Sequence, residues 1–122
     1  MLLMRVDEKA DTSSLFKLPP RITKPSHFRY VFQSGRMAEN GSVKVYFSKA
    51  QEATRKVAFV AGKKVGNAVI RNICKRRLRE LFRLHQYEIK SDIDIVMVAK
   101  SNLARTLFKK AETDLMKLLP HV

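Results

Sequence analysis

The chain has 122 residues, of which 45% are hydrophobic and 30% charged, and this indicates one globular domain large enough for a single core. Its 25 lysines and arginines against 11 acids give a formal net charge of +14, so we expect an anionic partner, with nucleic acid first and an acidic membrane or protein second. The single cysteine, Cys74, excludes an intrachain disulfide, and no apolar run is long enough to span a membrane, so a soluble cytoplasmic protein is the simplest expectation.

The first predicted elements are an extension and a short helix. Residues 1–18 lack clear periodicity and indicate a weakly ordered extension in front of a domain that spans residues 19–122. Residues 27–34 predict a helix, because apolar side chains recur at helical spacing. Ser26 is the expected N-cap of this helix, and Gly35 is expected to stop it.

Two strands follow the first helix. Residues 42–48 alternate in part between apolar and polar side chains, and residues 56–61 are mostly apolar and β-branched or aromatic. A polar turn at residues 51–54 lies between them. We therefore expect the two strands to pair as a hairpin.

A long basic helix is predicted from Asn67, its N-cap, to about residue 86. Between Arg55 and Arg83 the sequence holds ten lysines or arginines and one acid, so this segment carries a net +9 of the total +14. On a helical wheel one arc about 140° wide is polar or cationic. Its members are Arg71, Asn72, Lys75, Arg76, Arg79 and Arg83. The opposite arc is apolar apart from Arg77, whose stem is expected to lie over apolar surface with its head in water. The members of the apolar arc are Ile70, Ile73, Cys74, Leu78, Leu81, Leu84 and His85.

The C-terminal part predicts one strand and one helix. Residues 93–99 are almost continuously apolar, which is typical of a central strand. Ser101 or Asn102 is expected to cap the last helix, which Pro120 ends. Its apolar side is expected to hold Leu103, Leu107, Ala111, Leu115, Leu118 and Leu119. The elements together predict an α+β fold with helices packed on a small sheet.

Few side chains are candidates for catalysis. Asp92 and Asp94 stand one residue apart at a strand start and could hold a cation or act as a general base, although a polar strand start is the more ordinary interpretation. The histidines have no metal-ligand spacing with one another or with Cys74, and each is interpreted as a surface or core residue. These histidines are His27, His85 and His121. Cys74 is interpreted as a small buried hydrophobe.

Two groups of side chains suit nucleic acid. Phe28, Phe32 and Tyr46 could belong to the core or could stack on unpaired bases, because aromatic rings beside cations commonly hold single strands. Lys63 and Lys64 lie in a glycine turn before the long helix, where a phosphate could bind. The cations of the long helix could form a solvated face, but they lack the interleaved acids that would neutralise them.

The stretch GKKVGNAVIRNICKRRLRE resembles the signature of the bacterial ribonuclease P protein component. The resemblance covers residues 19–119 and includes an opening of Arg21, Ile22, Phe28, Val31, Phe32 and Gly35, together with the strand DIVMVA. The family motif has Arg-Asn-Arg at the start of the basic helix. Here Arg71 and Asn72 are followed by Ile73, which replaces the second arginine.

The resemblance implies an αβββαβα two-layer α+β sandwich, of a kind also found in ribosomal proteins, with a small mixed sheet and a left-handed βαβ crossover. It also implies the protein subunit of a ribonucleoprotein that removes the 5′ leader of precursor tRNA, with the catalytic centre in the RNA and no catalytic residue in the protein. The implied RNA-binding residues are Lys63, Lys64, Arg71, Asn72, Lys75, Arg76 and Arg79. The implied leader-binding residues are Phe28, Phe32 and Tyr46. Mg²⁺ is expected at the RNA or at the RNA–protein interface, without a protein motif for it, and one protein is expected per catalytic RNA.

Two other functions stay open from the residues alone. One is a structural, ribosomal-type RNA-binding protein without a substrate cleft, which would bind precursor and mature tRNA alike. The other is a metal-dependent nuclease that uses Asp92 and Asp94, in which case changing both to Asn would abolish cleavage.

Overall fold

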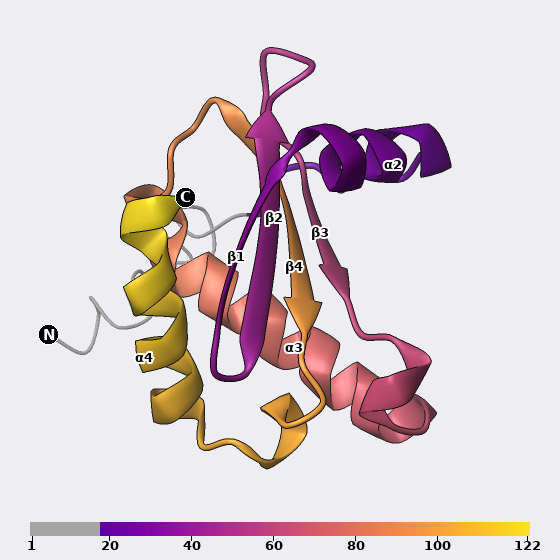
Figure 1. Ribbon diagram of the computed structural model, residues 1–122, viewed down its shortest axis with the longest axis vertical. Helices are drawn as coiled ribbons and strands as arrows, with labels where there is room; N and C mark the ends of the chain where they lie inside the picture. Colours follow the sequence, from indigo (N-terminus) through magenta and orange to yellow (C-terminus); the bar gives the residue numbers. More distant parts are fainter. Residues whose placement is uncertain (1–17) are drawn as a thin grey trace, which may run out of the picture.

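The computed structural model describes residues 18–122, which form a four-stranded mixed sheet with helices on both faces (Figure 1). The strands stand in the order β1-β2-β4-β3. Their bounds are β1 Arg36–Asn40, β2 Val43–Lys49, β3 Val57–Val60 and β4 Ile93–Ala99. The helices are α2 Pro25–Ser34, α3 Ala68–His85 and α4 Phe108–Leu118, with short 3-10 turns η1 Lys63–Val65, η2 Gln86–Glu88, η3 Leu103–Arg105 and η4 Leu119–His121. The α+β class and the element order implied by the resemblance are confirmed, whereas the predicted extension lies outside the described residues except for Leu18.

Strand β4 lies in the centre of the sheet and determines how the other strands pair. It runs antiparallel to β2 and parallel to β3. The predicted hairpin between residues 42–48 and 56–61 is therefore wrong, because β4 lies between these two strands. The hairpin joins β1 to β2 instead. The sequence pattern hid β1, because this edge strand has no buried side chain and so lacks apolar alternation.

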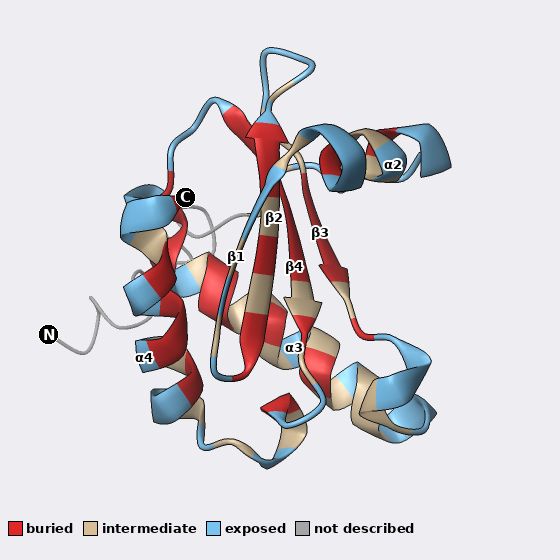
Figure 2. Cartoon of the chain, in the orientation of Figure 1, coloured by how far each residue is buried: buried red, intermediate tan, exposed pale blue. Residues whose placement is uncertain are grey.

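The two faces of the sheet carry separate cores, because side chains alternate between the faces along each strand. The main core lies between the sheet and helices α3 and α4. The sheet is one of the two predicted layers, and these two helices are the other. A smaller core lies on the opposite face beneath α2, which covers only one end of the sheet (Figures 1 and 2). Its buried members are Ile22, Val31, Ala58 and Val96.

The connection from β3 through α3 to β4 is a left-handed crossover. In Figure 1 both strands point downward, β4 stands to the left of β3, and α3 passes behind the sheet. Parallel strands are joined by right-handed crossovers in the great majority of folds. The handedness therefore agrees with the resemblance and departs from the general rule.

Helix α3 begins where the sequence predicts, because the Asn67 side chain accepts a hydrogen bond from the Ile70 amide at 3.0 Å. Its buried face is rotated from the predicted apolar arc. Phe82 falls among the cations on the wheel, yet it is completely buried against the sheet. Leu84, by contrast, is exposed at the other margin of the arc.

Arg77 does not extend its head into water as predicted. Its guanidinium donates hydrogen bonds to the carbonyl of Leu103, at 3.1 Å, and to the carbonyl of Thr106. The side chain thus ties the middle of α3 to the segment that leads into α4.

The predicted cap of the first helix is wrong. Helix α2 begins at Pro25 with Lys24 as N-cap, so Ser26 lies within the first turn. Proline suits this position because its fixed φ fits a helix and its missing N–H has no partner to lose there.

The start of the last helix also differs from the prediction. Ser101 and Asn102 precede the turn η3, and α4 begins only at Phe108. Leu107 is 78% exposed and does not join the core. The predicted core positions that hold are Leu103, Ala111, Leu115 and Leu118, with Leu119 partly buried. Within residues 18–122, no helix is both long and apolar enough to cross a membrane.

Candidate nucleic-acid interface

An aromatic cluster lies where α2 crosses the sheet. The rings of Phe28 and Phe32 stack with their centroids 6.5 Å apart, and Phe32 meets Tyr46 of β2 edge-on at 4.7 Å. Phe32 is 40% exposed, whereas Phe28 and Tyr46 are half-buried against the smaller core. The structure thus brings the three predicted leader-binding side chains together, with packing on one side and ring surface open on the other.

Asp94 of β4 holds α2 in place above the sheet. Its Oδ2 lies 2.6 Å from Nε2 of His27 in the first half of α2, and its Oδ1 accepts a hydrogen bond from the Lys56 amide at 2.8 Å. His27 and Asp94 are both buried. Asp92 is exposed in the turn before β4, so the two aspartates differ in surroundings, and both Asp94 oxygens are already engaged in holding the fold.

A basic hollow continues from the aromatic cluster along the same face of the sheet. Lys44 stands two residues from Tyr46 on β2, and so both side chains leave the same face. The hollow has a volume of about 630 Å³. It is lined by Lys44, Gly62, Lys63, Lys64, Val65, Val98, Ala99, Lys100 and Ser101. Four lysines and no acid therefore surround a partly apolar floor.

One acid borders this basic hollow. Lys100 Nζ lies 2.8 Å from Glu39 of β1, and that hydrogen bond lowers the pKa of the Glu39 carboxyl. Lys44, opposite Glu39 in the strand register, lowers it further by its charge. Among residues 18–122, Lys63 and Lys64 have no ion-pair partner, and both are exposed.

The predicted cations of α3 lie along one side of that helix and form what we call the cationic arc. Its members are Arg71, Lys75, Arg76 and Arg79. None of them has an ion-pair partner within the described part of the chain, where the one acid of α3, Glu80, pairs with Arg83 at 2.5 Å. Asn72 is exposed on the same side. The arc therefore carries uncompensated positive charge beside the sheet edge formed by β3.

Arg21 extends the cationic arc, although the sequence patterns did not place it there. Residues 20–22 pair in parallel with the outer edge of β3 at Val57. This pairing sets the Arg21 guanidinium 4.8 Å from the centre of the Phe59 ring. Burial lowers the pKa of Arg21, and the charge of Arg79 lowers it further. Only the pairing with β3 reveals this neighbourhood, because the two arginines are 58 positions apart in the chain.

The turn η1 joins the basic hollow to the cationic arc. Lys63 and Lys64 of this turn line the hollow, and α3 begins a few residues later. Gly66 makes the change of direction with a φ of 152°, and a Cβ there would lie 2.9 Å from the Ile70 side chain. The two lysines therefore belong to both the basic hollow and the start of the cationic arc. The aromatic cluster, the basic hollow and the cationic arc thus follow one another along the surface.

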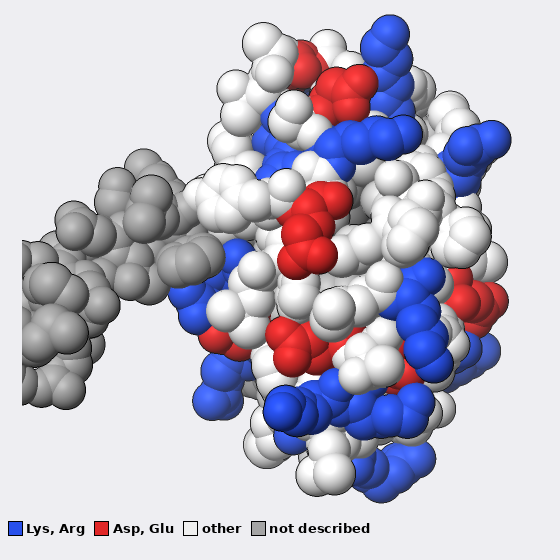
Figure 3. Space-filling model, turned by 90° about the vertical axis from the view of Figure 1, so that its left-hand side faces the viewer, with Lys and Arg blue, Asp and Glu red and all other residues white. Residues whose placement is uncertain are grey.

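The face that carries α4 has a different charge pattern, with acids gathered among the cations (Figure 3). His85 bridges two of these acids, Glu88 at 2.6 Å and Glu112 at 2.7 Å. Asp114 accepts hydrogen bonds from the Ser42 amide and hydroxyl and from Lys110, which together lower its pKa despite the opposing effect of burial. Acids on this face thus serve internal contacts and leave the cationic arc unneutralised.

The described residues offer little for metal or nucleophilic chemistry. Between residues 18 and 122, no group of three or more histidines, cysteines or carboxylates could hold a metal ion. Cys74 is completely buried, and this burial raises the pKa of its thiol. Cys74 and His27 are both buried, as expected for core residues.

Comparison with known proteins gives a consistent result. The family model described as Ribonuclease P matches residues 16–122. The ribonuclease P protein component of Alkaliphilus metalliredigens is 33% identical over 99 residues, which cover 81% of this chain and 89% of that protein. The ribonuclease P protein component of Syntrophomonas wolfei is 31% identical over 99 residues, which cover 81% of this chain and 83% of that protein. The RNase P protein of Staphylococcus aureus superposes with a TM-score of 0.71 at 29% identity, covering 82% of this chain and 92% of that one. The RNase P protein from Thermotoga maritima superposes with a TM-score of 0.73 at 28% identity, covering 84% and 96%.

Proposed function

The chain belongs to the ribonuclease P protein family, and from this premise we propose that it is the protein subunit of a ribonuclease P ribonucleoprotein, which binds the catalytic RNA and the 5′ leader of precursor tRNA. The observation that carries the proposal is the continuity of three surfaces. The aromatic cluster leads into the basic hollow, and the hollow leads through η1 to the cationic arc.

Each surface suits a different part of the RNA. The cluster of Phe28, Phe32 and Tyr46 offers ring surface on which unpaired leader bases stack. The lysines of the hollow offer charge to the phosphates of the same strand. The cationic arc and Asn72, on the other side of η1, offer a second contact area for the catalytic RNA.

The mechanism that we propose is differential binding. Precursor tRNA has a leader that can lie across the aromatic cluster and the basic hollow, and mature tRNA lacks it. The protein therefore stabilises the complex with substrate over the complex with product. Its cations also reduce the repulsion between two folded RNAs.

In this proposal the protein assists the endonuclease, and the catalytic centre lies in the RNA. Asp94 fits the assisting role, because its carboxylate is buried and already bound by His27 and Lys56. We also propose that Mg²⁺ binds to the RNA or at the RNA–protein interface, that one protein binds each catalytic RNA, and that the complex works in the cytoplasm.

Cleavage of a precursor tRNA at low magnesium tests the proposal. Three reactions are compared: a bacterial ribonuclease P RNA alone, the same RNA with the protein, and the protein alone. We expect the protein to stimulate cleavage only when the RNA is present. Cleavage by the protein alone would favour a nuclease that uses Asp92 and Asp94, and tight RNA binding without stimulation would favour a structural RNA-binding protein.

A further inference from the structure

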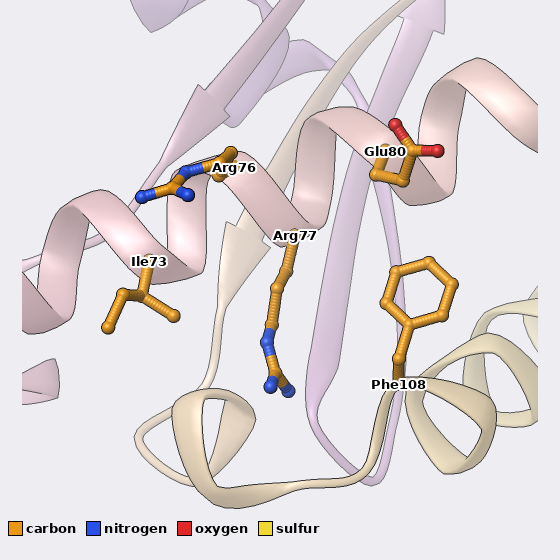
Figure 4. A pocket seen from close by; sticks show the side chains of 5 residues that line it. All are labelled: Ile73, Arg76, Arg77, Glu80 and Phe108. Atoms are coloured by element: carbon orange, nitrogen blue, oxygen red, sulfur yellow. The ribbon is translucent and has the colours of Figure 1, made fainter.

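We propose that a pocket beside the cationic arc binds one unpaired base of the partner RNA, and that this base carries an exocyclic amino group. The inference rests on the proposed function, because it takes the catalytic RNA as the partner. The pocket has a volume of about 370 Å³. It is lined by Ile73, Arg76, Arg77, Glu80 and Phe108 (Figure 4).

Two apolar side chains stand on opposite sides of the pocket. Figure 4 shows Ile73 of α3 on one side and the ring of Phe108, the first residue of α4, on the other. Both are half-buried, so part of each remains open to the pocket. An aromatic ring and an aliphatic side chain suit the flat faces of a nucleobase, and such stacking tolerates any base.

Arg77 lies between these two side chains and is fixed in place. Its guanidinium donates hydrogen bonds to the carbonyls of Leu103 and Thr106. These bonds hold the guanidinium against the segment that leads into α4, where it forms part of the pocket wall. A planar guanidinium held in this way is a further surface for stacking.

Glu80 borders the pocket and can act as an acceptor there, because each carboxylate oxygen keeps a second lone pair beyond its bond to Arg83. Its carboxylate accepts hydrogen bonds from Arg83 Nε at 3.0 Å and Nη2 at 2.5 Å, and these bonds lower the pKa of Glu80, which keeps the group ionised. A carboxylate accepts from the amino groups of cytosine, adenine or guanine, as it does from cytosine in DNA. Uracil has no amino group, so the pocket is expected to disfavour it.

Arg76 connects the pocket to the cationic arc. This residue lines the pocket, is exposed, and lacks an ion-pair partner among residues 18–122. A phosphate backbone that follows the arc passes the pocket at Arg76, where one base can turn inward. The uncompensated charge at this rim favours a nucleotide over an apolar or basic peptide.

Binding of the full-length protein to a transcribed bacterial ribonuclease P RNA over a series of salt concentrations tests this inference. Phe108→Leu is expected to weaken binding about fivefold or more at every salt concentration, because one stack is lost. The slope against salt should stay unchanged, because no phosphate contact is lost. Phe108→Tyr should bind like the parent. Leu107→Ala is the matched control, because Leu107 is 78% exposed and does not line the pocket.

A crosslinking measurement keeps the test decisive if Phe108→Leu fails to fold by circular dichroism. Replacing Phe108 by p-azidophenylalanine retains the ring, and irradiation should link it to one unpaired adenine, cytosine or guanine. Crosslinks that form only within the protein, to residues 1–17, would overturn the base-binding pocket. A folded Phe108→Leu protein that binds the RNA like the parent would also overturn it. Neither result would contradict the proposed function. Failure of the parent protein to bind the RNA at all would overturn both.

Discussion

Two buried histidines, His27 and His85, each contact carboxylates, yet they act on opposite faces of the sheet. His27 joins α2 to Asp94 on the face with the aromatic cluster. His85 joins the end of α3 to Glu88 and Glu112 on the face with α4. A change at either histidine should lower stability, but only the first lies beside a proposed RNA-binding surface.

His27 is expected to position the aromatic cluster. In His27→Leu, the buried Asp94 carboxylate loses its side-chain donor, which should cost about 1–3 kcal/mol of unfolding free energy. Helix α2 would then be free to shift and carry Phe28 and Phe32 with it. Filter binding of the assembled ribonucleoprotein should show weaker binding of precursor tRNA and unchanged binding of mature tRNA. His27→Gln, which can donate from a similar position, should restore the preference.

The matched control for this prediction is His85→Leu, which removes a comparably buried histidine far from the aromatic cluster. It should lower stability and leave the preference for precursor unchanged. Equal loss of preference in the two leucine variants would show that general destabilisation, not the position of α2, is responsible.

His85 should make stability depend on pH. Burial lowers the pKa of His85, but its hydrogen bonds to Glu112 and Glu88 outweigh burial and raise the pKa above the ordinary 6.5. Because the folded-state pKa is the higher one, the stabilisation is fully present below the unfolded pKa and is lost as pH rises through the folded pKa. Urea unfolding of the parent and of His85→Leu should therefore differ most in acid and converge toward alkaline pH. His121→Leu, at an exposed histidine, should follow the parent, and a constant difference at all pH values would contradict the assignment.

Of the three helix caps predicted by local rules, the one at Asn67 is correct, and those at Ser26 and at Ser101 or Asn102 are wrong. The cap at Asn67 depends on residues three apart, and the structure confirms it. The contact of Arg77 with two carbonyls and the approach of Arg21 to Arg79 join segments far apart in the chain, which no local pattern reveals. The burial of Phe82 was not predicted for a related reason. The elements that pack on α3 determine which side of it is buried, and a helical wheel does not show them.

At the scale of elements, a close junction joins the β1–β2 hairpin to α4. Gly41 turns the hairpin with a φ of 53°, and Asp114 of α4 lies directly against it. The Asp114 carboxylate holds the next residue, Ser42, through its amide at 3.2 Å and its hydroxyl at 3.1 Å. This junction connects the sheet edge to the last helix.

Gly41→Ala should therefore be strongly destabilising. A Cβ at Gly41 would lie 2.2 Å from Asp114 Oδ2, and the positive φ alone costs a non-glycine residue about 1–3 kcal/mol. The midpoint of urea unfolding should fall accordingly. Gly62→Ala is a matched control, because a Cβ there meets nothing within 4 Å, and this variant should keep the parent's midpoint. A stable Gly41→Ala protein would contradict the close packing of Asp114.

The elements themselves were largely predictable, whereas their pairing was not. The strand at residues 93–99 and the helix from Asn67 to about residue 86 were predicted close to their observed bounds, because each has a strong apolar pattern. Strand β1 was missed by periodicity because it is an edge strand with exposed side chains. The hairpin between the second and third strands was predicted wrongly, because a turn between two strands does not show whether a third strand inserts between them.

For the whole molecule, the distribution of charge matters more than its sum. Acids gather on the face with α4, whereas the cationic arc and most of the basic hollow lack acid partners among residues 18–122. The net charge of +14 is thus concentrated where RNA is proposed to bind. Binding should release counterions mainly from one side of the protein.

Salt dependence tests this asymmetry. Lys75→Ala should weaken binding to ribonuclease P RNA and reduce the slope of log affinity against log salt by about 0.7–0.9, the value for one lost phosphate contact. Lys117→Ala removes the same charge from the exposed side of α4 and should leave the slope almost unchanged. Equal changes in both variants would indicate that only the net charge matters.

The central place of β4 also constrains when the protein can fold during synthesis. Strands β2 and β3 are made early, but each pairs with β4 and not with the other. The sheet therefore cannot close until residue 99 has left the ribosome exit tunnel, although η1 and α3 are made before it. Contacts this distant in sequence form slowly. The contact of His27 with Asp94 and the Val98–Ala99 side of the basic hollow both need β4, so we expect neither RNA-binding surface to be complete before β4 is available.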